Sequence, residues 1–199
     1  MTATKPQCEI ETTALDGIVV IRSTVHYDDR GYFFESFNAR DFATLGLPTH
    51  FVQDNVSLSK RGVLRGLHFQ WNEPMGKFLR VCVGRIQLVE LDIRPDSPFC
   101  GKHWSIELTA EEHRAVWIPP GFANGFLVLS DVAIVMYKCT AFYNPAGEGV
   151  IRWDDPALGI PWMTNGTPLT SPKDAQGMTL AEWLVQPHAR VFSYYHPPQ

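Results

Sequence analysis

The chain has 199 residues, of which 45% are hydrophobic and 12% aromatic, which is enough apolar surface for a sizeable core. Its formal net charge is −4 and its basic residues are scattered among acidic ones, which argues against nucleic-acid and anionic-membrane partners. No apolar run approaches the roughly 20 residues that span a bilayer, and the N-terminal stretch MTATKPQCEIETTALDG holds no apolar signal segment. We expect a cytoplasmic protein.

The segment from 17 to 37, GIVVIRSTVHYDDRGYFFESF, predicts two strands around the polar turn DDRG. Gly31 can supply the positive φ that a tight turn favours. A short helix should follow, with Asn38 as its N-cap and Gly46 just beyond its C-terminus.

Residues from about 50 to 155 form short segments rich in Val, Ile, Phe and Tyr, separated by Gly, Pro, Asp or Asn every ~8 to 12 residues. That spacing is typical of an all-β sandwich or barrel. No repeat or Ser/Gly linker interrupts the chain, so we expect one domain over 1–199. Its parts are N-terminal strands at 17–37, a barrel at about 50–155 and a C-terminal helical segment at about 175–199, with Thr179 capping a helix at 180–184.

The four cysteines form no CxxC pair and no zinc-binding spacing. Cys82 and Cys139 lie within apolar, strand-like runs, and we expect the cysteines to be reduced and buried. The barrel strands offer a single imidazole, His68, while His103 and His113 lie in surface-like stretches. Because metal sites in such barrels combine several imidazoles with a carboxylate, we expect no bound metal.

The segment RGVLRGLHFQ, 61–70, raises the question of what His68 does. A histidine in an apolar strand is usually a packed core residue. In a lumen without metal it can instead act as a general base, if a carboxylate fixes its tautomer. Strict alternation sends Arg65 and His68 to opposite faces, unless Gly66 hosts a β-bulge that turns the strand.

A proton acid would complete such a site. Tyr137 lies in AIVMYKCTAFY, where period 2 puts it on one face with Ala133, Val135 and Cys139. A phenol donates a proton at pH 7 and tolerates an apolar lumen, but the same pattern fits a core tyrosine.

Several ordered blocks, between about residue 16 and 176, resemble the dTDP-4-dehydrorhamnose 3,5-epimerases and related nucleotide-sugar epimerases. They are DDRGYFFESFN, FVQDNVS, KRGVLRGLHFQ, GKFLRVCVG, DIRPDSPFCGKHW, WIPPGFANGF, MYKCTAFYNPAGEGVIRWDDPALGIPW and SPKDA. The resemblance implies a double-stranded β-helix, a cupin-like jelly-roll barrel with short peripheral helices. It also implies a homodimer, no cofactor, and a nucleotide-diphosphate sugar as substrate.

The resemblance also implies roles for single residues. His68 matches the general base, Asp174 its carboxylate partner, Tyr137 the acid, and Lys77 the lysine that stabilises the enolate. Without the resemblance, Asp174 would be taken for a turn aspartate, because proline and glycine bound its loop. The substrate-binding positions that it implies are Arg30, Glu35, Gln53, Asn55, Arg65, Asn124, Tyr143 and Glu148.

Two positions depart from the family pattern. Asn124 stands where the family has histidine, in GFAHGF, and Leu88 stands where it has an aspartate. This coupled loss indicates a pair that interacts in the family and that this chain has dispensed with. The base, its carboxylate and the acid remain.

We therefore expect epimerisation, at C3 and C5, of a nucleotide-diphospho-4-keto-6-deoxy sugar, as in the conversion of dTDP-4-dehydro-6-deoxyglucose to dTDP-4-dehydrorhamnose. Three alternatives stay open: epimerisation at C3 alone, a different nucleotide-linked 4-keto hexose or heptose, and a carbohydrate-binding cupin without activity.

Overall fold

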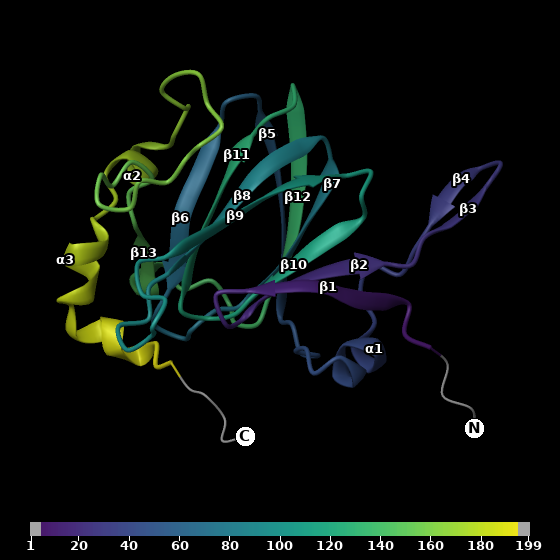
Figure 1. Cartoon of the computed structure of the whole chain (residues 1–199), viewed down its shortest axis with the longest axis horizontal. Coiled ribbons are helices and arrows are strands. Elements are labelled where there is room, and N and C mark those ends of the chain that lie inside the picture. Colours follow the sequence, from purple (N-terminus) through teal and green to yellow (C-terminus); the bar gives the residue numbers. More distant parts are fainter. Residues whose placement is uncertain (1–4, 195–199) are drawn as a thin grey trace.

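Short strands with alternating apolar residues pair into two antiparallel sheets in the computed structural model, which describes residues 5–194 (Figure 1). The first sheet has the order β1 (Cys8–Ala14), β2 (Ile18–Ser23), β10 (Arg114–Ile118), β7 (Lys77–Val83), β12 (Val132–Cys139) and β5 (Gln53–Lys60). The second has the order β13 (Glu148–Val150), β6 (Leu64–Gln70), β11 (Phe122–Val128), β8 (Arg85–Asp92) and β9 (His103–Thr109). The predicted all-β, cupin-like jelly-roll barrel is confirmed.

The two sheets pack their inner faces together around an apolar core. Its buried side chains come from both sheets and include Val81, Leu88, Val116, Phe126 and Val135. Side chains alternate across each strand, so every second residue faces inward. The apolar ones among these inward residues form the core and cover only part of the inner face. The rest of the inner face forms the site described below.

Short helices cover the outer faces. Helix α1 (Ala39–Thr44) begins at Asn38, whose side chain accepts a hydrogen bond from the backbone N–H of Arg40, and Gly46 follows it with φ of 71°. Its Phe42 packs in a cluster on the outer side of the first sheet. Both predicted ends of this helix are confirmed.

The outer face of the second sheet is covered by the C-terminal part of the chain. Helix α2 (Pro172–Ala175) is followed by α3 (Leu180–Leu184), which Thr179 begins with a capping box, and by a 3₁₀ turn at Pro187–Val191. Trp183 packs edge-on against Phe69 with ring centroids 4.5 Å apart. The predicted helix at 180–184 is confirmed, while the end of the predicted C-terminal segment, 195–199, lies outside the described residues.

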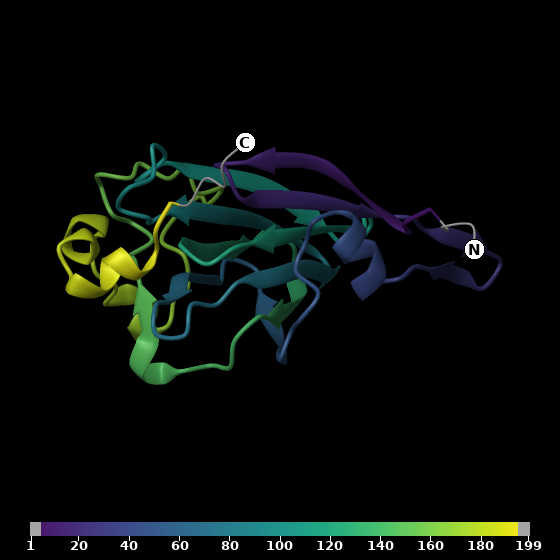
Figure 2. The same ribbon diagram turned by 90° about the horizontal axis from the view of Figure 1, so that it is seen from below.

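A hairpin of β3 (His26–Asp28) and β4 (Gly31–Phe33) projects from the barrel, at the end opposite α3 (Figures 1 and 2). Gly31, with φ of 130°, lies at the end of its turn. The prediction of two strands over 17–37 was wrong in number, since β2, β3 and β4 all lie there. The hairpin exposes Tyr27, Tyr32 and Phe33.

Three further features differ from the expectations. Strand β1 was not predicted, because it lies at a sheet edge with five of its seven residues exposed and so lacks a buried face. Cys82 is exposed and Cys8 and Cys100 are partly buried, so that Cys139 alone is the buried thiol that was expected. His113 is buried rather than surface-like.

No helix among residues 5–194 is long and apolar enough to cross a membrane.

Candidate active site

The inner face of the barrel changes from apolar to polar at the same level on four strands. On β12 the inward residues Ala133 and Val135 give way to Tyr137, and on β7 Leu79 gives way to Lys77. The registers Tyr137↔Leu79 and Cys139↔Lys77 put these changes side by side. One end of the barrel is therefore filled by the apolar core, and the other end holds a polar pocket.

The opposing sheet shows the same change. Leu88 on β8 is followed by Glu90 on the same face, and Phe126 on β11 is preceded by Asn124. Asn124 pairs with Glu90 on one side and with His68 on the other, so the three side chains form a row across the second sheet.

A β-bulge gives His68 its direction. Phe126 pairs with Arg65 and Asn124 pairs with His68, so that β6 has one more residue over this stretch than β11. Arg65 and His68 therefore share a face, as the bulge predicted at Gly66 requires. A Cβ at Gly66 would stand 2.5 Å from the Cα of Gly125, which explains the glycine at this close approach of backbones.

The pocket at this level, here called the lumen pocket, has a volume of about 90 Å³. It is lined by Asn55, His68, Phe69, Gln70, Met75, Lys77, Tyr137, Tyr143 and Glu148. The predicted base, acid and lysine thus lie around one cavity, together with three of the predicted substrate contacts. Among residues 5–194 no three acidic, histidine or cysteine side chains are grouped to hold a metal ion.

His68 and Asp174 form a hydrogen-bonded dyad. The His68 Nε2 lies 2.5 Å from the Asp174 Oδ1, and the carboxyl is 4% exposed. Burial raises the pKa of the Asp174 carboxyl, but the hydrogen bond and charge of His68 outweigh burial and leave that pKa below its ordinary value. A carboxylate only accepts, so Nε2 carries the proton and Nδ1 is left as the basic nitrogen.

Helix α2 holds Asp174 in this position. Ser171 caps the helix by accepting from the Asp174 N–H, and Pro172 occupies its first position. The loop aspartate expected from the local sequence is therefore part of a one-turn helix, and it lies nearly buried against β6.

Tyr137 supplies a protonated phenol. Burial, chiefly, raises its pKa above the ordinary value of 10.0, so the hydroxyl keeps its proton at neutral pH. The positive charge of Arg65 opposes this shift in pKa, and Arg65 itself donates from Nε to the Ser59 Oγ at 2.9 Å. The phenol is therefore a competent proton donor.

Hydrogen bonds link four of the predicted contacts at the lumen pocket: Gln53, Asn55, Tyr143 and Glu148. The Gln53 amide donates to Asn55 and its oxygen accepts from the Tyr143 N–H, while the Tyr143 hydroxyl donates to Glu148 at 2.7 Å. Lys173 also donates to Glu148. These contacts order the polar side chains before any ligand is bound.

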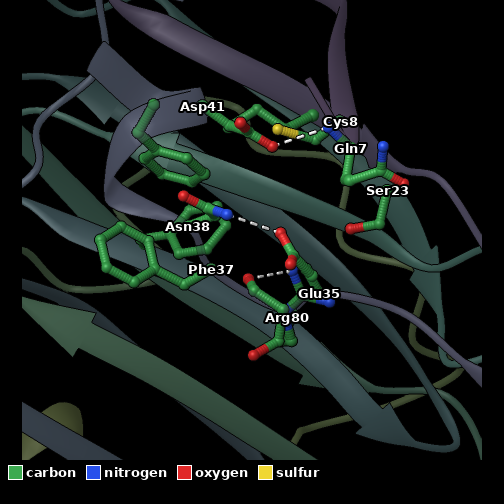
Figure 3. A pocket seen from close by; sticks show the side chains of 12 residues that line it. Gln7, Cys8, Ser23, Glu35, Phe37, Asn38, Asp41 and Arg80 are labelled. Carbon is green, nitrogen blue, oxygen red and sulfur yellow. Dashed lines mark hydrogen bonds between the residues drawn. The ribbon is translucent and has the colours of Figure 1, made fainter. Parts of the chain in front are cut away.

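Arg30 and Glu35 do not reach the lumen pocket. Arg30 lies on the projecting hairpin with a side chain 90% exposed, bound to Asp28. Glu35 lines a separate cavity beside α1, where its carboxylate accepts from Asn38 (Figure 3). That cavity has a volume of about 10 Å³, room for about one water molecule. Their predicted contact with substrate stays a prediction.

Sequence reasoning missed Glu90. It is fully buried, and its Oε1 accepts from the Asn124 Nδ2 at 2.6 Å. The chain lacks the histidine and the aspartate of the family pattern, and Asn124 pairs with Glu90 instead while Leu88 joins the core. The alternation Ile86, Leu88, Glu90 in IQLVE was the available signal.

Replacing Asp174 with asparagine should make stability less dependent on acid. The folded pKa of Asp174 lies below its ordinary value, so its carboxylate stabilises the fold fully above about pH 4, and the contribution is lost as the pH falls through the folded pKa. Urea unfolding between about pH 7 and pH 3 should show the wild type losing its advantage over Asp174→Asn. Asp131→Asn, which alters an exposed carboxylate, is the control. An advantage that stays constant down to about pH 3 would contradict this linkage.

Comparison with known proteins agrees with this geometry. The family model for dTDP-4-dehydrorhamnose 3,5-epimerase matches residues 12–182. A dTDP-4-dehydrorhamnose 3,5-epimerase from Methanothermobacter thermautotrophicus is 51% identical over 150 residues, which is 75% of this chain and 81% of that protein.

Solved structures share the fold over nearly the whole chain. The dTDP-6-deoxy-D-glucose-3,5-epimerase from Legionella pneumophila, in complex with dTDP-4-keto-L-rhamnose, superposes with a TM-score of 0.88 at 40% identity, covering 96% of this chain and 100% of that one. A 3′-monoepimerase from Streptomyces bikiniensis, in complex with dTDP-quinovose, has a TM-score of 0.80 at 33% identity, covering 85% and 86%. The dyad, the phenol and the lysine thus lie in the barrel fold that this chain shares with known epimerases. The chain belongs to the dTDP-4-dehydrorhamnose 3,5-epimerase family of isomerases.

Proposed function

We propose that this protein epimerises a dTDP-linked 4-keto-6-deoxy sugar at C3 and C5, converting dTDP-4-dehydro-6-deoxyglucose to dTDP-4-dehydrorhamnose. The observation that carries the proposal is the convergence of a carboxylate-backed imidazole and a protonated phenol on one pocket. Inverting a carbon needs such a pair, because the proton must leave one face and return to the other.

Each inversion uses the same sequence of proton transfers. The Nδ1 of His68 removes the proton from the carbon beside the ketone, and the C–H electron pair moves into the carbonyl to form an enolate. The Lys77 ammonium stabilises the charge on that oxygen. The Tyr137 hydroxyl then returns a proton to the opposite face, the ketone re-forms, and exchange with solvent restores both residues.

The size of the lumen pocket indicates that only the sugar part of the substrate enters it. A volume of about 90 Å³ accommodates the reacting sugar end, while a whole nucleotide sugar needs a site of about 300 Å³ or more. The diphosphate and nucleotide would therefore lie outside the pocket, where Arg65, exposed and on the same face of β6 as His68, offers a guanidinium for phosphate.

The number of inverted carbons separates the leading proposal from a 3-epimerase. After turnover in D₂O, mass spectrometry should find two solvent deuteriums in the product, one at each inverted carbon, whereas a 3-epimerase incorporates one. The structural relative from Streptomyces bikiniensis is a 3′-monoepimerase, so this alternative has a precedent among similar proteins. The pair Glu90 and Asn124 lies in one row with His68 across the second sheet, where it can alter the sugar that is accepted.

A panel of substrates tests the remaining alternatives. The dTDP-, GDP- and CDP-linked forms of the 4-keto sugar, and a 4-keto heptose, should show fastest deuterium uptake with the dTDP-linked hexose. A protein that binds these compounds and exchanges no deuterium is a carbohydrate-binding cupin, and that result would contradict the proposal.

All four cysteines are free, which supports a cytoplasmic setting.

We also propose that the protein is a homodimer. Strand β5 is an edge of the first sheet and exposes Val56 and Leu58, 67% and 59% exposed, on the outer face. Such neighbouring apolar side chains, together with the aromatic residues of the projecting hairpin, form the kind of surface that a partner covers. A second copy of the chain would bring its own hairpin, and with it Arg30, to this surface.

Replacing Leu58 with glutamate should convert the dimer to a monomer, because a charge cannot be buried there without a partner. Light scattering coupled to gel filtration should give about twice the 22.5 kDa chain mass for the wild type and the single chain mass for Leu58→Glu. Val185→Glu, at a site 80% exposed after α3, should leave the mass unchanged. A wild-type mass of one chain, or a dimeric Leu58→Glu, would contradict this interface.

A further inference from the structure

Gln70 carries a buried amide that the proton transfers above do not use. It is the last residue of β6, lines the lumen pocket and is 4% exposed. Among residues 5–194 its side chain makes three hydrogen bonds, and all of them go to backbone groups in loops. Its Nε2 donates to the carbonyl oxygens of Glu73 and Phe142, at 2.8 and 3.0 Å, and its Oε1 accepts from the Asn144 N–H at 2.8 Å. An amide is the uncharged side chain that offers two donors and an acceptor together.

These three bonds join two loops that also pack directly on each other. The 71–76 loop connects β6 to β7, and the 140–147 loop connects β12 to β13. The Trp71 N–H donates to the Gly147 carbonyl oxygen at 2.8 Å. A Cβ at Gly147 would stand 2.8 Å from the carbonyl oxygen of Asn72, so the two backbones approach closely. The loops therefore form one unit, with the amide between them.

The 71–76 loop is fixed to the rest of the barrel. The Trp71 ring stacks on the His188 ring from the C-terminal 3₁₀ turn, with centroids 3.9 Å apart and planes 10° apart. Glu73 has φ of 59°, a left-handed conformation that residues other than glycine rarely adopt. The hydrogen bond from Gln70 to the Glu73 carbonyl oxygen helps to hold that conformation. The amide thus connects a fixed loop to its neighbour.

The 140–147 loop receives the other two bonds on either side of Tyr143. Gln70 binds the residue before it and the residue after it, and the Gln53 Oε1 accepts from the Tyr143 N–H at 2.9 Å. This stretch lies in no helix or strand, so side chains supply the partners that regular pairing does not. Tyr143 lines the lumen pocket but is 53% exposed, so these bonds and its contact with Glu148 set its place more than burial does.

We propose that Gln70 is a positioning residue that ties the two loops together and thereby holds Tyr143 in place to contact the substrate. The part of Tyr143 in substrate binding rests on the proposed function. Gln70 acts through Tyr143 and touches no reacting atom. Its loss should therefore weaken substrate binding, because the binding side chain is no longer ordered beforehand, and leave the proton transfers unchanged.

The kinetic test uses Gln70→Met, which keeps the length of the side chain and removes its three hydrogen bonds. The KM for the dTDP-linked 4-keto sugar should rise about fivefold to tenfold, while kcat stays within about twofold. In a Tyr143→Ala background the same substitution should change KM by less than about twofold, because the residue through which it acts is gone. Gln186→Met, which alters an exposed glutamine whose side chain makes no capping bond, is the control and should keep both constants.

A second readout does not need turnover. Chymotrypsin cleaves after aromatic residues, and Phe142 and Tyr143 are both exposed. Gln70→Met should raise the rate of cleavage after these two residues by about fivefold or more, because a loop must open locally before a protease can cut it. Cleavage after Tyr32 and Phe33, on the projecting hairpin, is the internal control and should keep its wild-type rate. Peptide mass spectrometry separates the two regions.

Faster cleavage in the 140–147 loop, with a KM effect that disappears in the Tyr143→Ala background, supports the proposal. Unchanged cleavage overturns it. A KM effect of equal size in both backgrounds, or a loss confined to kcat, also overturns it, because either result marks Gln70 as a structural group only. The cleavage rate decides even if no nucleotide sugar is turned over, which separates failure of this proposal from failure of the proposed function. Gln70→Glu, which keeps the acceptor and loses both donors, serves if Gln70→Met does not fold.

Discussion

Replacing His68 with glutamine should lower kcat by about 10²- to 10⁴-fold, the usual contribution of general base catalysis. The glutamine amide can still donate to Asp174 in place of Nε2, so the nearly buried carboxylate keeps its partner and the barrel should stay folded. The basic Nδ1 is lost, however, and no proton can be taken from the carbon beside the ketone. Both inversion and deuterium exchange should therefore fall together.

The matched control is His50→Gln, which alters an exposed histidine before β5. It should retain wild-type kcat and solvent exchange. Circular dichroism and the urea midpoint should show that His68→Gln is folded. A folded His68→Gln with full activity would remove His68 from the role of base and leave its dyad with Asp174 as a packing feature.

Replacing Tyr137 with phenylalanine should separate proton removal from inversion. The ring stays packed against the apolar core, but the hydroxyl that returns a proton to the opposite face is gone. Inversion should fall by about 10²-fold or more. His68 can still remove a proton and return one to the same face, so deuterium should enter the substrate with retained configuration.

The measurement is the ratio of exchange to inversion, followed by mass spectrometry and by NMR of the sugar protons. The control is Tyr194→Phe, which removes a hydroxyl that donates to Asp16 and does not line the lumen pocket. Its ratio should equal that of the wild type. Equal losses of exchange and inversion in Tyr137→Phe would place the phenol on the same step as His68 and contradict the assignment of two faces.

The elements that the sequence predicts well are those with a clear period or cap. Alternation places the strands of the barrel, and Asn38 and Thr179 mark helix starts because their side chains accept backbone hydrogen bonds. Strand β1 escapes prediction because its exposed residues carry no alternation of burial. The turn DDRG predicts the hairpin at 26–33, but not that its strands are separate from β2, since its aromatic side chains stay largely exposed among residues 5–194.

Within the site, local pattern and resemblance contribute different parts. Period 2 predicts that Tyr137 shares a face with Val135, and Gly66 predicts the bulge that brings Arg65 and His68 to one face. Asp174 could be placed only by resemblance, because it is more than a hundred residues from His68 and meets it through tertiary packing. Glu90 was missed because a single carboxylate in an apolar strand has no partner visible in sequence; Asn124, its partner, lies on another strand.

The central claim is that a base and an acid stand on opposite sides of one sugar ring. It is tested most directly by a crystal structure of the wild type with a bound dTDP-4-keto sugar. We predict that the ring lies between the Nδ1 of His68 and the hydroxyl of Tyr137, each about 3 to 3.5 Å from a carbon beside the ketone and on opposite faces. A ring bound outside the lumen pocket, or with both groups on one face, would contradict the account.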